Sequence, residues 1–189
     1  YTGLDTKRKE LMLSEIAFQA FQTKRVFLYE RELIQQIEAI LQKMLPGQKH
    51  INGTLVLKSI EVQHGVLVER AEGIYSFSHL TIQEFLTAQY VAEQDQRINE
   101  LVNDHLLDRR WTEVFLLVSG LKCADVLLMK LAEKSQTYLS SKRLHRLLLW
   151  INEKTQNPRS KLEPEVKRAI ALFLILELLQ CLDPRGLYT

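Results

Sequence analysis

The spacing of apolar residues changes twice between residues 54 and 92, and this change constrains the fold more than any other feature. Helical spacing over 54–63 gives way to two short β-prone runs, Val66–Val68 and Ile74–Ser78. Between them lies Glu72-Gly73, where glycine tolerates the positive φ of a tight hairpin turn. The segment therefore predicts a β-hairpin that follows one helix and precedes another.

Two more helices are predicted before this hairpin. Apolar residues recur at helical spacing over 7–23 and again from Leu33 to Met44, where Pro46-Gly47 ends the pattern. The third helix runs from about Thr54 to Gln63, and Gly65 is well placed as its C-terminal cap. Three helices followed by a hairpin is the element order of a winged helix, so we expect a winged-helix domain over residues 1–92.

The pattern after residue 92 is helical to the end of the sequence. Amphipathic stripes recur at short intervals, and the last helix is predicted from Pro164 to about Leu182. The sequence contains only seven glycines and four prolines, which favours helices over an all-β fold. We therefore predict a mainly α protein, with an all-helical domain over residues 93–189 that forms a bundle or a solenoid-like stack.

The composition bears on location and on partners. A net charge of +2 argues against strong non-specific binding to nucleic acid or anionic lipid. Cys123 and Cys181 lie in apolar helical patterns, which is typical of buried thiols in a reduced, cytoplasmic protein. The most apolar run, residues 169–182, is interrupted by Glu177 and is shorter than the ~20 residues that cross a bilayer. We expect no membrane contact.

Sequence patterns for catalysis are missing. The chain has no phosphate-binding loop, no dinucleotide fingerprint, no H-E-x-x-H, no C-x-x-C and no G-x-S-x-G. We therefore expect neither enzymatic activity nor a metal site within this chain. A DNA-binding winged helix is one alternative, but the third helix carries only Lys58 and Glu61 as charges and the wing tip, 69–72, is net acidic. A plain helical protein-interaction scaffold is another.

The junction of the hairpin with the next helix contains a lone histidine, His79. The spacing of Thr81 and Glu84 predicts a capping box, and Leu80 with Phe85 predicts a hydrophobic staple across the helix start. Phe77 and Phe85 are expected in the core. From these residues alone, a histidine at such a corner is more commonly a packing or hydrogen-bonding residue than a ligand contact.

Residues 73–88 resemble the signature F-x-F-x-H-x-(S/T)-x-Q-E-(F/Y)-x-A-A of NACHT-type signal-transducing NTPases. This family of STAND proteins includes NOD-like immune receptors and bacterial anti-phage proteins, and we expect a prokaryotic member. Thr87 stands where an alanine is common. The matching residues are Phe77, His79, Thr81, Gln83, Glu84, Phe85 and Ala88.

The resemblance implies a nucleotide-dependent switch in signalling or defence. In that family an upstream domain of the same chain holds ADP or ATP with Mg²⁺, and the winged-helix histidine contacts the β-phosphate of ADP. Exchange for ATP releases the winged helix, and protomers then assemble. The resemblance thus implies that His79 senses the nucleotide and that Phe77, Thr81, Gln83, Glu84 and Phe85 are structural. The chain would be a non-catalytic, regulatory part of a longer NTPase, with the upstream domain and other protomers as partners.

Overall fold

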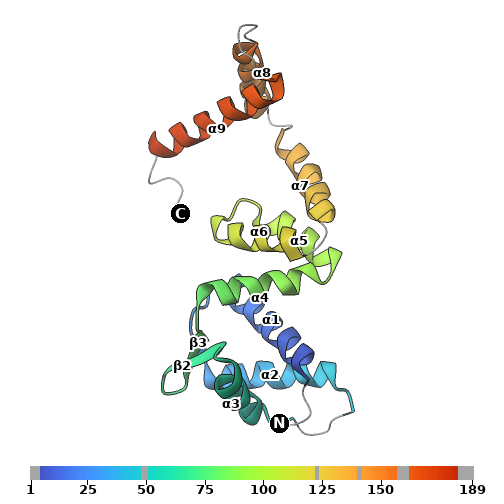
Figure 1. Ribbon diagram of the computed structural model, residues 1–189, viewed down its shortest axis with the longest axis vertical. Helices are drawn as coiled ribbons and strands as arrows, with labels where there is room; N and C mark the ends of the chain where they lie inside the picture. The colour runs from blue at the N-terminus through green and yellow to red at the C-terminus, as the bar shows by residue number, and fades with distance from the viewer. Residues whose placement is uncertain (1–4, 48–50, 122–123, 140–141, 157–161, 183–189) are drawn as a thin grey trace. The chain divides into compact units, whose positions relative to one another are not determined.

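The computed structural model describes residues 5–47, 51–121, 124–139, 142–156 and 162–182, and the chain divides into two compact units, 1–131 and 132–189 (Figure 1). Within these residues the protein is mainly helical with one small antiparallel sheet, which confirms the predicted fold class. Cys123 and the side chain of Cys181 lie outside the described residues.

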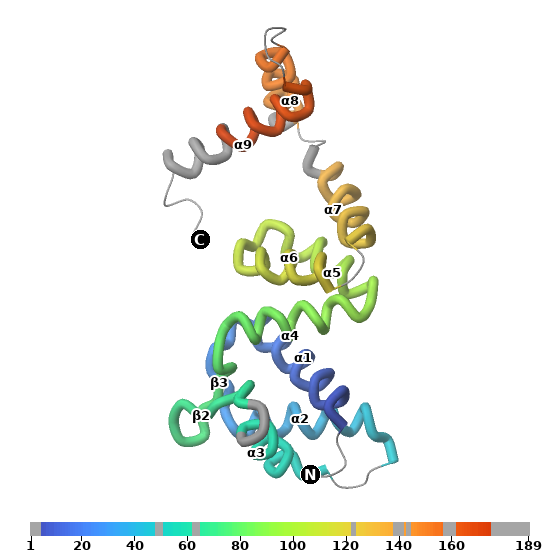
Figure 2. Tube along the Cα trace, viewed as in Figure 1, coloured from blue at the N-terminus to red at the C-terminus, as the bar shows by residue number. Residues whose placement is uncertain are grey.

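The first unit begins with the elements of a winged helix. They are α1 (Thr6–Gln22), β1 (Leu28–Tyr29), α2 (Glu30–Met44), α3 (Gly53–His64), β2 (Leu67–Ala71) and β3 (Ile74–Phe77). The two strands of the predicted hairpin pair antiparallel, and β1 adds a third strand, which gives the order β1-β3-β2. The Cα trace in Figure 2 shows the hairpin beside α3.

Local signals in the sequence explain where these elements begin and end. Asn52 caps α3 by accepting a hydrogen bond from the Leu55 amide at 3.1 Å. Gly65 ends α3 in the left-handed region with φ of 55°, which confirms the predicted cap. Gly73 has φ of 67° in the hairpin turn, a conformation that glycine adopts without steric cost. The observed ends of α1 and α3 lie within one residue of the predicted ones.

A hydrophobic core fills the space between the three helices and the sheet. Its centre is formed by fully buried aliphatic residues of α1, α2 and α3, such as Ile16, Leu41 and Ile60. Tyr75 and Phe77 of β3 close it on the sheet side. This core fixes the position of the strand that leads to His79.

Four more helical elements follow in the same unit. They are α4 (Leu80–Ala92), α5 (Asp95–His105), the 3-10 turn η1 (Arg109–Trp111) and α6 (Thr112–Leu121), and α7 (Ala124–Leu139) begins here. Helix α4 packs on α1 and on α6 (Figure 1). A second core surrounds Trp111 and contains Phe21 of α1, Ala88 and Val91 of α4, and residues of α5 to α7. The proposed domain boundary at residue 92 stays a prediction.

The second unit contains the end of α7, α8 (Lys142–Thr155) and α9 (Pro164–Leu182). Helices α8 and α9 pack on each other, and the Arg168 guanidinium donates to Asn152 Oδ1 at 2.9 Å between them. The start of α9 at Pro164 agrees with the predicted first turn. Among the described residues, no helix combines the length and the apolar character that crossing a membrane requires.

Candidate functional site

His79 stands at the point where β3 ends and α4 begins. Its backbone is extended, with φ of −139° and ψ of 147°, and it is the N-cap residue of α4. The residue is exposed, whereas Phe77 two positions earlier is buried in the first core. Within the described part of the chain, the imidazole has no hydrogen-bond or ion-pair partner. The ring is therefore available to a group outside these residues.

The backbone that carries His79 is held on both sides. The Ser78 amide donates to the Val66 carbonyl at 2.9 Å, and the Arg70 Nη2 donates to the Ser78 carbonyl at 3.1 Å. Arg70 Nε also donates to Ser76 Oγ at 2.9 Å. On the helix side, the His79 carbonyl accepts from the Ile82 amide at 3.2 Å and from the Gln83 amide at 3.3 Å. These bonds fix the corner relative to the hairpin.

Arg70 was not predicted to have a role. The sheet register shifts between Glu69 and Ala71, so Arg70 lies in an irregularity of β2. Such an irregularity turns a side chain away from the direction that strand alternation gives it. The alternating pattern of the hairpin sequence contains no signal for this shift.

The predicted capping box and hydrophobic staple are wrong. The helix begins at Leu80 with His79 as N-cap, two residues before the N-cap position that the box assigned to Thr81, and no side chain caps it. Thr81 and Glu84 therefore both lie inside the helix and do not occupy the N-cap and N3 positions of a capping box. Leu80 is 62% exposed and Phe85 40% exposed, so Phe85 is not a core residue.

Gln83 and Glu84 lie on the buried face of α4 near its start. Gln83 is 6% exposed and Glu84 8% exposed. Burial raises the pKa of the Glu84 carboxyl above its ordinary value, and the Glu113 carboxylate adds to this increase. Because the folded-state pKa is raised, ionisation of Glu84 reduces stability as the pH rises from the unfolded pKa to the folded one.

We expect Glu84→Gln to be more stable than the wild type at pH 7. The amide cannot ionise, so the loss of stability that accompanies Glu84 ionisation disappears. The difference in free energy of unfolding should vanish well below the usual glutamate pKa of about 4.3. Urea unfolding of both proteins at several pH values measures it. Glu72→Gln, at an exposed position of the wing, is the matched control and should show no such pH-dependent gain.

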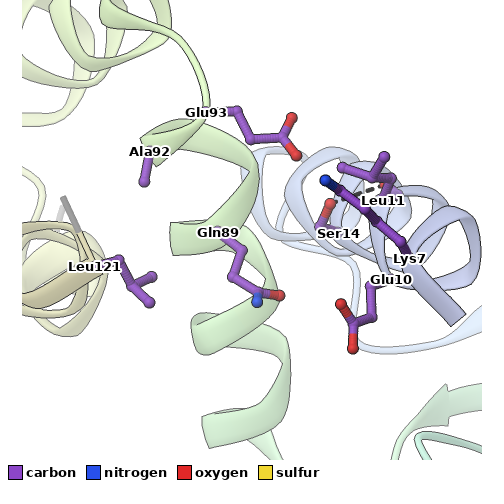
Figure 3. Close-up of a pocket in the computed structure, with 8 residues that line it drawn as sticks. All are labelled: Lys7, Glu10, Leu11, Ser14, Gln89, Ala92, Glu93 and Leu121. Carbon is purple, nitrogen blue, oxygen red and sulfur yellow. Dashed lines mark hydrogen bonds between the residues drawn. The ribbon is translucent and has the colours of Figure 1, made fainter.

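A cavity on another part of α4 has a lining of both polar and apolar residues (Figure 3). Its charged and amide side chains are Lys7 and Glu10 of α1, Gln89 of α4, and Glu93, which follows α4. Ser14 Oγ donates to the Leu11 carbonyl at 2.8 Å, and Glu93 pairs with Arg97 at 3.1 Å. Its charged groups are exposed to solvent or already paired, so no set of unpaired buried groups is present to select a ligand.

Residues 4–91 match the family model described as a winged helix-turn-helix domain C-terminal to NACHT. No curated protein and no solved structure matches the chain. The matched range contains the three helices, the sheet and nearly all of α4, and thus includes His79. A winged-helix domain that follows NACHT is a regulatory region rather than a catalytic one. Residues 4–91 are thus similar to winged helix-turn-helix domains that lie C-terminal to NACHT.

Proposed function

We propose that this chain is the nucleotide-state sensor of a NACHT-type signalling NTPase that acts in defence. A nucleotide-binding domain upstream in the same protein holds ADP or ATP with Mg²⁺, and His79 donates a hydrogen bond to the β-phosphate of ADP. This contact keeps the winged helix closed on the upstream domain. Exchange for ATP breaks the contact, frees the winged helix and allows protomers to assemble.

The observation that carries this proposal is the exposed, unpartnered imidazole on a fixed corner. Since the backbone of Ser78 and His79 is bonded to the hairpin and to α4, the position of His79 follows the orientation of the whole domain. A contact made by this ring therefore reports a domain position rather than a local side-chain movement. A histidine buried in its own core with both nitrogens bonded could not do this.

The surroundings of His79 suit a phosphate. An imidazole donates an N–H, which a phosphate oxygen can accept. His79 is the N-cap residue of α4, and the first amides of a helix have no acceptor within it, so they place a partial positive charge next to His79. Imidazole and helix start thus attract the same kind of ligand group.

The alternative of a DNA-binding winged helix finds little support in α3. On the part of α3 whose side chains are described, Lys58 is the one cation, and Leu55 is 52% exposed. Such a surface neutralises one phosphate at most, and affinity for DNA rises with the number of phosphates neutralised. The exposed leucine suits contact with another protein surface.

We expect His79→Ala in the full-length NTPase to accelerate the release of ADP about tenfold or more. The loss of a hydrogen bond to a charged group costs about 1.5–3 kcal/mol, and 1.4 kcal/mol corresponds to tenfold in an equilibrium constant. Stopped-flow release of a fluorescent ADP analogue measures the rate. ATP release should change much less, because the proposed contact exists only in the ADP state.

His145→Ala is the matched control, because His145 is an exposed histidine on α8, outside the matched domain. Its ADP release should equal that of the wild type. Spontaneous assembly of the His79 variant in the presence of ADP, measured by light scattering, would add support. Unchanged ADP release from His79→Ala would remove this residue from the mechanism.

A further inference from the structure

A cavity of about 380 Å³ lies within the first unit, between the end of α1, the start of α4 and residues 109–113. Its apolar wall is formed by Ala20, Phe21, Val26 and Leu80. The volume falls within the range of roughly 300–1,000 Å³ that small-molecule sites occupy. The cavity has its own polar groups, and His79 is not part of its lining.

Gln83 and Glu84 line this cavity and are both more than nine-tenths buried. Thr87 Oγ1 donates to the Gln83 backbone carbonyl at 2.7 Å, but this bond does not involve the Gln83 amide group. Within the described residues, neither the Gln83 amide nor the Glu84 carboxyl has a hydrogen-bond partner. Among the described residues, Trp111 Nε1 is the one fully buried side-chain nitrogen or oxygen without a partner, so the polar atoms of Gln83 and Glu84 keep access to solvent. Because both residues line the cavity, these atoms can contact a ligand there.

Four cationic residues line the same cavity: Lys24, Arg25, Arg109 and Arg110. Arg25 is paired with Glu32 and Arg110 with Asp108. Lys24 and Arg109 form no direct ion pair among the described residues. The pKa of the Asp108 carboxyl is lowered by its hydrogen bond from Arg110, and the Lys24 charge also contributes to this lowering. Lys24 also has a φ of 59°, a left-handed conformation that glycine would adopt at lower cost. A lysine in this strained position is consistent with a role for its side chain.

We propose that this cavity binds a nucleoside monophosphate whose base carries an amino group. The base lies against the apolar wall, its amino group donates to the Glu84 carboxylate, and the Gln83 amide bonds a neighbouring ring nitrogen. Adjacent amide and carboxyl groups can read the donor and acceptor edge of a base in this way. The phosphate lies between Lys24 and Arg109, because cations on flexible side chains bind phosphate oxygens by charge-assisted hydrogen bonds.

The test is calorimetric titration of the 189-residue chain with adenosine 5′-monophosphate, inosine 5′-monophosphate and adenosine. Inosine monophosphate replaces the amino group by a carbonyl, which cannot donate to Glu84, and should bind at least tenfold more weakly. Adenosine lacks the phosphate and should also bind at least tenfold more weakly. Equal affinities for the two monophosphates, or no binding of the adenine nucleotide, would overturn the proposal.

Substitutions of cavity residues test where the phosphate and the base of the ligand bind. Arg109→Ala should weaken the binding of the monophosphate about tenfold and leave the affinity for adenosine unchanged. Because Arg109 is exposed, the fold should tolerate this substitution. Glu84→Leu should remove the preference for the amino base, with circular dichroism to verify folding. His79→Ala should leave all three affinities unchanged. A loss of binding in the His79 variant would place the phosphate next to His79 and contradict a separate cavity. The ADP-release experiment tests the proposed contact between His79 and ADP independently of this cavity.

Discussion

Trp111→Ala is expected to lower the free energy of unfolding of the first unit by about 3–5 kcal/mol. The indole is fully buried at the centre of the second core. Phe21 meets it edge-on with ring centroids 4.9 Å apart, and His105 stacks on it at 3.9 Å with an interplanar angle of 10°. Alanine leaves a large cavity that ordered neighbours from five helical elements cannot close. Urea unfolding followed by circular dichroism measures the loss.

Trp150→Ala is the matched control for this change. Trp150 lies on α8 and is 51% exposed, so its truncation removes the same atoms without emptying a core. Surface substitutions of this kind usually change stability by less than about 0.5 kcal/mol. A similar loss from both variants would contradict the assignment of Trp111 as the centre of the second core.

Ile60→Ala is expected to destabilise the first core by about 2–5 kcal/mol. Ile60 is fully buried on α3 and lies in the cluster that α1, α2 and the sheet share. Truncation removes three carbon atoms from a space that the sheet closes on one side. Ile170→Ala, at a 45% exposed position of α9, should have little effect on stability.

The comparison of Ile60→Ala with Trp111→Ala also tests how the two cores are connected. Helix α1 supplies Ile16 to the first core and Phe21 to the second. Because one continuous helix belongs to both, each substitution should lower the midpoint of a single unfolding transition. Two separate transitions, one for each core, would show instead that the winged helix unfolds independently of α5 and α6.

The helices and the hairpin could be predicted because their signals are local. The apolar spacing that predicts α1 and α3 lies within each segment's own sequence. Gly65 and Gly73 indicate their positive φ by residue type alone. The same holds for the corner position of His79, which follows from the end of a β-prone run and the start of a helical one.

What could not be predicted depends on contacts between distant segments. The pairing of β1 with β3 joins Leu28 to Tyr75 across 47 residues. The irregularity at Arg70 and the start of α4 at Leu80 are likewise set by packing on other elements. Spacing alone favoured Thr81 as the cap, but the helix begins at Leu80 with His79 as the N-cap residue. The cavity beside Gln83 combines residues from three separate segments, and no motif connects them.

Helix α4 has its first residues beside the exposed imidazole and its last turns inside the tryptophan cluster. Leu86 belongs to the first core, while Ala88 and Val91 belong to the second. Its 13 residues span about 20 Å. One helix thus connects the corner that carries His79 with the core around Trp111. If the proposed nucleotide contact moves α4, the packing around Trp111 changes and the fluorescence of this indole reports the movement.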